Sequence, residues 1–474
     1  MRTCRRIVFL LLIGALAAPA GVGKVYVRWT LSSVPSAKTL GVSDLVIPWG
    51  KDAQGLAGAA TKQGFHLYLE ATVQQAPTAA ETAAKEKFAG VILRGSATEE
   101  SQLIEMDRKL SATYPKLKIL MLSAGGKQPE MRGWLVFKRD GILQVSSPTS
   151  QPWLDANLAM IRQERAFQTT QAPLYTFSWD LSDPLVKEQG PNPADYALAV
   201  AEAGAFHADL LLELHEQQQK GLATGDKDTL MDWERVKRTI EFSERGNHNT
   251  PEVPATVAVL TNDYDSSYEA INLMARHNIP YRVLHLAEVK PQDLQGFDVV
   301  IAFAALGNEL SEAIRAFAEK GGVAVLVNLP GPYPWDSSTA TTKGAALSYA
   351  VGKGRVIELG ESVSDPETFA QDIRRLMLNQ RIPTSLWNSL TTLVAAYPGE
   401  KSGETIVELV NYDEEAAQVQ VRVKGTFGSA RYESPERGCC EKLKLGQVDG
   451  FTEFVVPDFM IGGRVLLQQV GRAK

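Results

Sequence analysis

The residues best suited to chemistry in this 474-residue sequence lie at the ends of short apolar segments in its first half. Three of them are carboxylates: Glu70, Asp180 and Glu213. A pair of carboxylates can cleave a glycosidic bond when one stays protonated as the acid and the other is ionised as nucleophile or base. We therefore predict acid–base chemistry on a sugar, with Asp180 as nucleophile or base and Glu70 or Glu213 as the acid.

Polar and aromatic residues at similar positions are candidates for holding the sugar. An indole ring can stack on a sugar ring, although a tryptophan at a strand end, such as Trp29, also packs beneath neighbouring loops. His215 can instead be a hydrogen-bonded residue of the fold. The predicted substrate-binding residues are Arg28, Trp49, Arg94, Gln144, Trp179 and His215.

Eight apolar segments, which alternate with stretches of helical spacing, must position these residues. Eight strand–helix cycles in about 220 residues match a (β/α)8 barrel, also called a TIM barrel, which typically takes ~250 residues. An open doubly wound sheet has the same alternation, but the count of eight and the α/β unit that follows favour the barrel. The predicted strands are 24–30, 44–49, 66–71, 90–95, 118–123, 142–147, 174–181 and 208–215.

The alternation of side chains along a strand decides which residues face the barrel interior. The uniformly apolar side of each strand suits the outer helices, so the polar side points inward. Active sites of such barrels lie at the carboxyl ends of the strands, where these side chains form a ring. The predicted ring contains Arg28, Tyr68, Glu70, Arg94, Gln144, Asp180, Glu213 and His215.

Structural ion pairs are an alternative role for two of the carboxylates. Glu213 on the eighth strand neighbours Arg28 on the first, because the barrel closes. Glu70 on the third strand likewise neighbours Arg94 on the fourth. Buried charges are usually paired, so both glutamates can equally be structural. Asp180 has no basic residue on an adjacent strand, which makes it the first candidate for catalysis.

The first twenty residues have the pattern of an export signal. Three arginines precede an apolar run over 7–16, and Ala18-Pro19-Ala20 forms a small-residue cleavage site. The apolar run is too short to span a bilayer. Cleavage would change the formal net charge from −6 to −9, because three arginines and no acids are lost. We predict an exported protein, periplasmic or extracellular, without a membrane span after cleavage.

The composition excludes several classes of protein. Hydrophobic residues make up 44% and charged residues 22%, as in ordinary folded chains. A mildly acidic chain without a basic stripe is a poor nucleic-acid binder, so carbohydrate is the expected partner. No segment has metal-ligand spacing or a phosphate-binding glycine loop, and no metal or cofactor is expected. Besides Cys4, only Cys439 and Cys440 are present, and adjacent cysteines rarely pair.

The length points to more than one domain. After the signal at 1–20, we predict a barrel over 21–250, a flavodoxin-like α/β domain over 251–385 and a small β-sandwich over 386–474. The predicted middle domain resembles class I glutamine amidotransferase domains. Such a domain needs a cysteine or serine nucleophile on the turn after a strand, and the turn at 304–307 reads AALG. We therefore expect a structural or assembly role for it.

The order of the three domains resembles that of glycoside hydrolase family 42 β-galactosidases. Residues 298–328, DVVIAFAALGNELSEAIRAFAEKGGVAVLVN, resemble the strand, helix, double-glycine turn and strand of that family's middle domain. ETIVELVNYDEEAAQVQVRV at 404–423 is similar to its terminal β domain. In the barrel the likeness is one of architecture. The resemblance implies hydrolysis of O-glycosidic bonds in an oligo- or polysaccharide, and a homo-oligomer.

The sequence departs from that family at its catalytic positions. The family places an acid/base glutamate after the fourth strand and a nucleophilic glutamate at the seventh. Here the fourth strand ends in Leu93-Arg94-Gly95 and the seventh in Trp179-Asp180. Two functions stay open: a hydrolase whose acid has moved to Glu70 or Glu213, or a catalytically inactive carbohydrate-binding or assembly protein.

Overall fold

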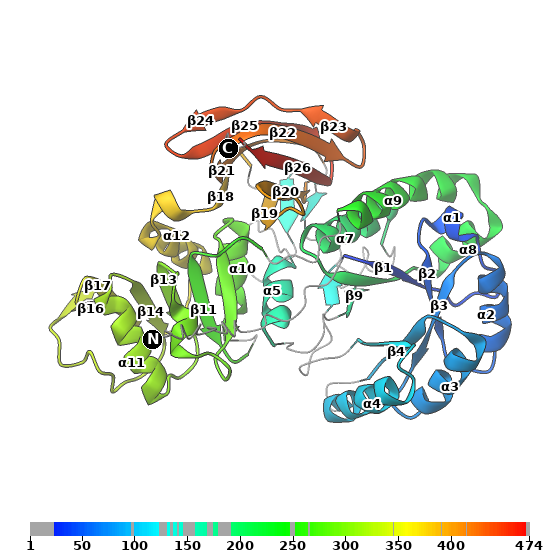
Figure 1. Cartoon of the computed structure of the whole chain (residues 1–474), viewed down its shortest axis with the longest axis horizontal. Helices are drawn as coiled ribbons and strands as arrows, with labels where there is room; N and C mark the ends of the chain where they lie inside the picture. The colour runs from blue at the N-terminus through cyan, green and yellow to red at the C-terminus, as the bar shows by residue number, and fades with distance from the viewer. Residues whose placement is uncertain are drawn as a thin grey trace, which may run out of the picture.

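The chain forms three bodies, seen side by side in the computed structural model of Figure 1. The barrel-like body carries the N-terminal half, an α/β body lies at the other side, and a β-sandwich lies against both (Figure 1). The structure describes residues 23–95, 99–122, 130–132, 136–139, 142–145, 157–167, 174–178, 191–246, 252–263, 266–344, 346–389, 391–413 and 415–470. None of the helices in these ranges is long and apolar enough to cross a membrane.

The first body is a curled sheet of eight parallel strands in the order β5-β4-β3-β2-β1-β10-β9-β6. This is the strand order of a (β/α)8 barrel, with the fifth and sixth strands at the two ends of the hydrogen-bonded series. The predicted fold class is confirmed. The strands are β1 Val25–Arg28, β2 Asp44–Pro48, β3 His66–Ala71, β4 Gly90–Leu93, β5 Lys118–Met121, β6 Glu130–Arg132, β9 Leu174–Ser178 and β10 Asp209–Glu213.

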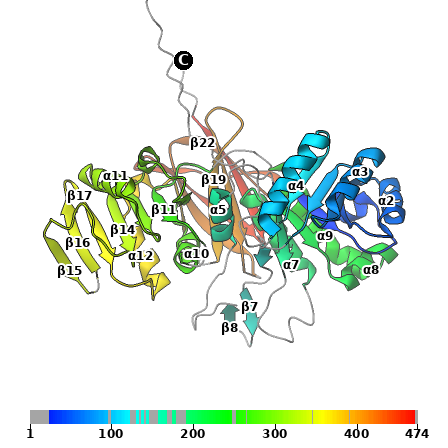
Figure 2. The ribbon, with the colours of Figure 1, turned by 90° about the horizontal axis from the view of Figure 1, so that it is seen from below.

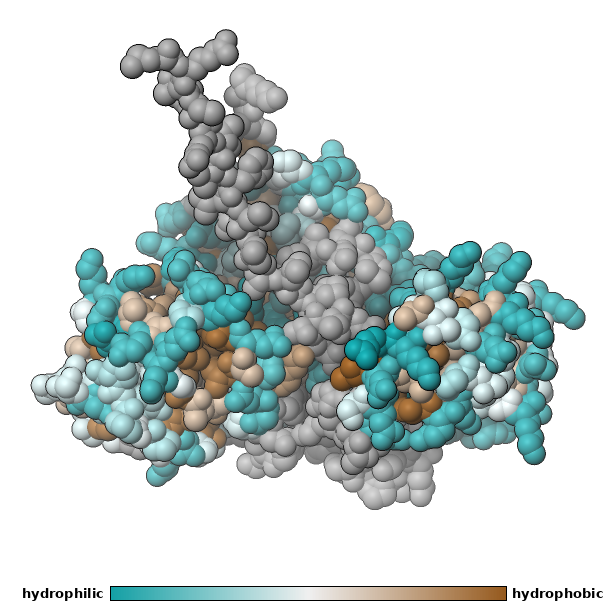
Figure 3. Space-filling model, turned by 60° about the horizontal axis from the view of Figure 1, so that its bottom comes forward, coloured by the Kyte–Doolittle hydropathy of each residue, from teal (hydrophilic) through white to brown (hydrophobic). Residues whose placement is uncertain are grey.

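Helices surround this sheet, and hydrophilic residues dominate the outer surface of the body in Figure 3. The helices are α1 Ala37–Leu40, α2 Ala53–Lys62, α3 Ala76–Glu86, α4 Glu100–Thr113, α5 Leu158–Phe167, α7 Pro193–Ala205, α8 Glu216–Thr224 and α9 Lys227–Arg245. Helix α7 begins with a capping box, in which Asn192 and Asp195 bond each other's backbone N–H groups.

The sixth predicted strand is wrong. Residues 142–147 were expected in the barrel, but Ile142–Val145 (β8) pairs antiparallel with Val136–Arg139 (β7) in a separate two-stranded sheet. Figure 2 shows this hairpin apart from the barrel. Asp140-Gly141 separates the two strands in the sequence, and this dipeptide favours a two-residue hairpin. The sixth position of the sheet belongs to β6, so Gln144 is not on a barrel strand.

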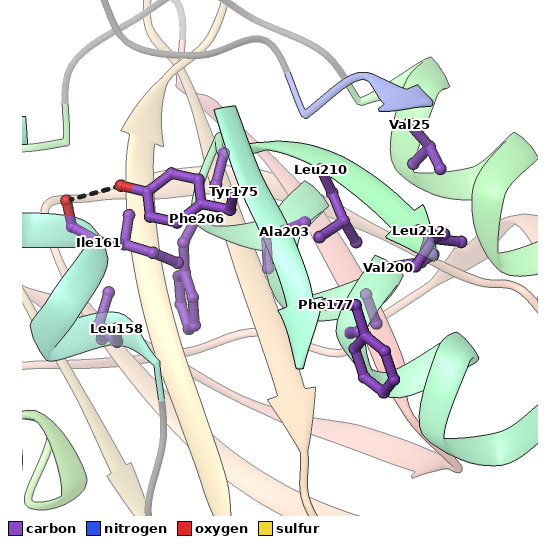
Figure 4. Packing of buried hydrophobic residues seen from close by; sticks show 14 of the residues in the cluster. Val25, Leu158, Ile161, Tyr175, Phe177, Val200, Ala203, Phe206, Leu210 and Leu212 are labelled. Atoms are coloured by element: carbon purple, nitrogen blue, oxygen red, sulfur yellow. Dashed lines mark hydrogen bonds between the residues drawn. The ribbon is translucent and has the colours of Figure 1, made fainter. Parts of the chain in front are cut away.

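The predicted alternation of side chains is confirmed on the described strands. Tyr26, Tyr68 and Leu211 pack together inside the barrel, where the two tyrosine rings meet edge to face at 5.2 Å. The residues beside them in sequence face outward instead: Val25 and Leu210 belong to the larger core beneath the helices. Figure 4 shows this outer layer, in which side chains of β9 and β10 lie against those of α7.

The second body is a seven-stranded sheet in the order β12-β11-β13-β14-β17-β16-β15. Its first five strands are parallel, in the flavodoxin-like order, and the last two are antiparallel. The predicted flavodoxin-like arrangement is confirmed, and the antiparallel strands β16 and β15 extend the sheet at one edge. The elements are β11 Val257–Thr261, α10 Tyr268–Arg276, β12 Tyr281–His285, η2 Pro291–Leu294, β13 Val299–Ala302, α11 Asn308–Glu319, β14 Val323–Val327, β15 Ala340–Lys343, β16 Ala346–Val351, β17 Gly354–Leu359, α12 Pro366–Leu376 and η3 Asn379–Arg381.

The third body is the predicted β-sandwich of two antiparallel sheets. The four-stranded sheet has the order β18-β21-β25-β24, and the five-stranded sheet has the order β19-β20-β26-β22-β23. Their inner faces share one core. The strands are β18 Thr384–Trp387, β19 Thr392–Pro398, β20 Glu404–Asn411, β21 Ala417–Lys424, β22 Phe427–Ser434, β23 Gly438–Lys442, β24 Gly446–Val448, β25 Phe451–Phe459 and β26 Gly462–Gln469.

The adjacent cysteines of β23 have their sulfur atoms side by side. In a regular strand, Cys439 and Cys440 would point to opposite faces. The pairing of β23 with β22 shifts at this point, so that Cys440 has no partner residue in the ladder. Such a bulge disrupts the alternation of the strand.

Buried polar contacts join the three bodies at α5 and α7. Arg162 of α5 forms an ion pair with Glu252 at 2.5 Å and lies over the ring of Tyr281 in β12. Burial opposes the charge of Glu252, but Arg162 outweighs it and the pKa of this carboxyl is lowered. A lowered pKa means that the contribution to stability is present at neutral pH and is lost as acid protonates the carboxylate.

Glu202 of α7 holds the sandwich against the barrel. Its side chain is 1% exposed, and it accepts hydrogen bonds from the Asn157 side chain and from the hydroxyl of Tyr412, both at 2.5 Å. The hydroxyl of Tyr397 in β19 also donates to the carbonyl of Ala205 at the end of α7, at 2.9 Å. The five-stranded sheet therefore faces the barrel.

We expect Tyr412→Phe to lower the free energy of unfolding by about 1–3 kcal/mol, because the buried Glu202 carboxylate loses a hydrogen-bond donor. Urea denaturation followed by circular dichroism measures the change. Tyr114→Phe, at a half-buried tyrosine for which the structure gives no hydroxyl hydrogen bond among the described residues, is the matched control. Equal unfolding midpoints for the two variants would contradict the role given to Tyr412.

Candidate functional site

Four charged side chains meet at one mouth of the barrel. Arg28 and Glu213 are the last residues of β1 and β10, Glu70 is the second-last residue of β3, and Arg94 follows β4 directly. The carboxyl ends of parallel strands lie at the same rim, which is where barrel enzymes have their active sites. The predicted inward direction of these four side chains is confirmed by their contacts.

The four residues form a closed ring of alternating charges, which we call the Arg–Glu ring. Glu70 accepts a hydrogen bond from Arg28 Nε on one oxygen, and its other oxygen forms an ion pair with Arg94 Nε, both at 2.5 Å. Arg94 also bonds Glu213 through its Nη2 atom, and Arg28 Nη1 lies 3.9 Å from Glu213 Oε2. Each carboxylate therefore has two guanidinium partners. The ion pairs that the sequence left open are present.

The ring is only partly open to water. Glu70 is 7% exposed, whereas the side chains of Arg28, Arg94 and Glu213 are 26%, 30% and 32% exposed. Burial lowers the pKa of Arg94, but the carboxylates of Glu70 and Glu213 outweigh it, and the net pKa is raised. A proton on either glutamate would weaken two ion pairs. A general acid has to carry such a proton before it can donate it to a leaving group.

The tryptophans near the mouth differ from each other. Trp49 follows β2, is half-buried, and donates its backbone N–H to the carbonyl of Glu70 at 2.7 Å. Trp29 is fully buried, and its indole N–H is shared by the carbonyls of Leu31 and Ser33. Trp29 is therefore a packing residue, because no face of its ring reaches solvent. Trp49 remains a candidate for stacking.

The structure describes only some of the other residues that were predicted for the site. His215 precedes α8 with an exposed side chain, and its backbone N–H donates to the hydroxyl of Tyr196 at 2.9 Å. Gln144 lies in the β7–β8 hairpin, as noted above. Trp179 and Asp180 lie outside the described residues. Whether the predicted residues bind or cleave a sugar stays a prediction.

Gln219 of α8 supports the mouth and was missed from the sequence. It is 5% exposed, accepts the backbone N–H of Thr30 at 3.0 Å and donates to the carbonyl of Leu214 at 2.9 Å. It thus joins the ends of the first and last strands. Residues 216–220 read EQQQK, and nothing in this polar run distinguishes Gln219 as the glutamine that is buried.

A second polar cluster closes the opposite end of the barrel. Lys24 pairs with the buried Asp44 at 2.9 Å, and Lys118 donates to the hydroxyl of Tyr26 at 3.0 Å. Burial raises the pKa of the neighbouring Tyr68 to about 12, so that this hydroxyl stays neutral. Residues at this end of a (β/α)8 barrel stabilise the fold, while the chemistry belongs to the other end.

Solved structures of several sugar-cleaving enzymes share this fold. α-L-Fucosidase isoenzyme 2 from Paenibacillus thiaminolyticus is 12% identical with a TM-score of 0.62, covering 95% of this chain and 100% of its own. β-Galactosidases from Rahnella sp. R3 and Bacillus circulans sp. alkalophilus are each 10% identical, with TM-scores of 0.55 and 0.51. They cover 93% and 95% of this chain and 98% and 99% of their own.

The likeness extends over all three bodies, so the predicted family 42-like architecture is confirmed as a fold. No protein-family model matches the chain, and no curated protein matches its sequence. At these identities the comparison concerns the fold alone, because one fold carries many functions. The function has to be argued from the site.

We expect Glu70→Gln to lower the free energy of unfolding by about 3 kcal/mol, because two half-buried guanidiniums lose a shared carboxylate. Glu213→Gln is expected to cost about 1 kcal/mol, since this side chain is 32% exposed and its ion pairs are screened. Chemical denaturation measures both.

Glu216→Gln provides the control for these two variants. Glu216 pairs with Lys220 on the surface of α8 with 65% of its side chain exposed, and its loss is expected to change stability little. If Glu70→Gln were as stable as Glu216→Gln, the ring would not hold the mouth together.

Proposed function

We propose that this chain is a carbohydrate-binding protein with a glycoside hydrolase fold. It binds a saccharide at the carboxyl-terminal mouth of the barrel and does not use Glu70 or Glu213 to cleave it. The observation that carries the proposal is the closed Arg–Glu ring, in which each glutamate is bound by two arginines.

The ring suits binding better than acid catalysis. Each of the two carboxylates is engaged by two guanidiniums, whereas a general acid needs an oxygen that is free to face the leaving group. The exposed parts of Arg28, Arg94 and Glu213 still offer fixed donors and acceptors to the hydroxyl groups of a sugar. Trp49 follows β2 at the same rim; its indole packs in part against the core beneath the helices, and the part that stays exposed can contact the apolar face of a sugar ring.

Hydrolysis of an O-glycosidic bond in an oligo- or polysaccharide is the second candidate. It is favoured by the position of Asp180 in the sequence, two residues after the end of β9, a strand of the barrel sheet. The fucosidase and galactosidases that share the fold are named for sugar substrates, which supports a carbohydrate ligand for both candidates.

Glycan binding separates the candidates. We expect the wild-type chain to bind members of an oligosaccharide panel in isothermal titration and to release no reducing sugar. Trp49→Ala should weaken binding about tenfold, since a tryptophan at the centre of a binding site commonly contributes this much. Met231→Ala, at a residue 70% exposed on α9, is the control and should bind as wild type does.

Two outcomes would overturn the proposal. Reducing sugar released by the wild type and lost in Asp180→Asn would establish the hydrolase instead. Binding of no glycan in the panel by a folded wild-type chain would remove the carbohydrate ligand from both candidates.

The proposal includes export by the signal over residues 1–20. Basic, apolar and small residues follow one another there in the order that signal peptidases recognise. We expect the mature chain to begin at Gly21 when the full sequence is expressed in a bacterium with an export pathway. Intact mass measurement tests this, and a protein that keeps its first twenty residues would contradict it.

A further inference from the structure

The outer face of the four-stranded sheet β18-β21-β25-β24 is turned away from the barrel. Helix α7 packs against β20 and β26 of the other sheet, so the five-stranded sheet faces the barrel (Figure 1). Val421 and Phe454 of the four-stranded sheet point into the sandwich core. Because side chains alternate along a strand, their neighbours Arg422 and Glu453 belong to the outer face.

This outer face carries an unusual share of exposed apolar side chains. Trp387, Val448 and Val455 are 39%, 44% and 51% exposed, and all three lie on it. Large exposed apolar residues that gather on one face mark interaction sites more often than singly scattered ones do. This face therefore offers separate apolar side chains that a ligand can contact.

The strand register sets the residues of the face in rows. Trp387 lies opposite Gln420, which lies opposite Val455. In the next row, Arg422 lies opposite Glu453. Side chains directly opposite each other on neighbouring strands are about 5 Å apart, so an indole, an amide, a guanidinium and a carboxylate share one small flat area.

The guanidinium of Arg422 lies over two aromatic rings, but its hydrogen bonds are incomplete. Its central carbon lies 4.0 Å from the ring centroid of Phe451 and 5.8 Å from that of Trp387. Its Nε atom has no hydrogen-bond partner among the described residues, and the nearest ion-pair atom, Glu453 Oε1, is 3.7 Å away. Because this Nε atom is itself buried, a ligand can meet only the 26% of the Arg422 side chain that stays exposed.

We infer that this face is a second saccharide-binding surface, with Trp387 as the stacking platform and Gln420, Arg422 and Glu453 as hydrogen-bonding groups. A sugar ring has an apolar face of C–H groups and an edge of hydroxyls, which matches an indole beside polar side chains. The inference adds a site to the one proposed at the barrel mouth and shares no residue with it.

Two observations favour a sugar over a macromolecule. The polar side chain of Gln420 separates the exposed Trp387 from Val455, so the apolar groups do not merge into the continuous patch of a protein interface. Arg422 is offset by Glu453, so the centre of the face is close to neutral, unlike a surface for an acidic peptide or nucleic acid. An uncharged saccharide is the partner that fits both.

The test uses the full chain with the barrel site weakened by Trp49→Ala. In this background, we expect a panel of neutral gluco-, galacto- and manno-oligosaccharides to produce a change in tryptophan fluorescence on binding. Trp387→Ala should reduce the remaining affinity about tenfold. Arg422→Met, which keeps the contact with Phe451 but removes the donors, should also reduce it.

Leu347→Ala and Arg375→Met are the matched controls, because both residues are exposed in the α/β body and lie outside the face. Circular dichroism checks that every variant is folded. Unchanged affinity in both Trp387→Ala and Arg422→Met would overturn the inference while leaving the barrel proposal standing. A change in oligomeric state without a change in sugar affinity would make the face a protein interface and also overturn it.

Discussion

The Arg–Glu ring is the constraint on which the mouth of the barrel depends. Two guanidiniums and two carboxylates occupy one partly buried layer, and such charges are tolerated only when they neutralise each other. The ring connects residues of β1, β3 and β10 with the residue that follows β4. Among the described strands, β5 and β6 are the two ends of the hydrogen-bonded sheet. The ion pair of Arg94 with Glu213 therefore joins strands that backbone hydrogen bonds do not join directly.

The ion pairs of the Arg–Glu ring also limit the chemistry that Glu70 and Glu213 can carry out. A glutamate whose carboxylate is engaged by two arginines is poorly placed to act as a proton donor, because its oxygens already face the guanidiniums. The residue after β4 is Arg94, at the point where family 42 enzymes have their acid, and it is the residue that links Glu70 with Glu213. A shared architecture with sugar-cleaving enzymes is therefore compatible with a site whose charges serve to bind and to hold the strands.

The buried contacts at α5 and α7 explain the placement of the other two bodies. Glu202 and Glu252 each take hydrogen bonds or ion pairs from a neighbouring body, which fixes the five-stranded sheet against the barrel and β12 against α5. The second sheet of the sandwich is left facing outward with Trp387 exposed. One set of interdomain contacts thus decides which face of the sandwich is available to a ligand.

The sequence by itself determined the three-domain order, the parallel strands and the inward direction of Arg28, Glu70 and Glu213, because side-chain alternation is a local property with a period of two residues. It misassigned Ile142–Val145, since an apolar segment does not specify which strand it pairs with. The burial of Trp29, the closure of the ring through Arg94 and Glu213, and the bulge in β23 were decided only by the tertiary structure. The first two depend on contacts between residues far apart in the sequence, and the third depends on a local shift in strand pairing. The spacing of residue types along the chain predicts neither kind of feature.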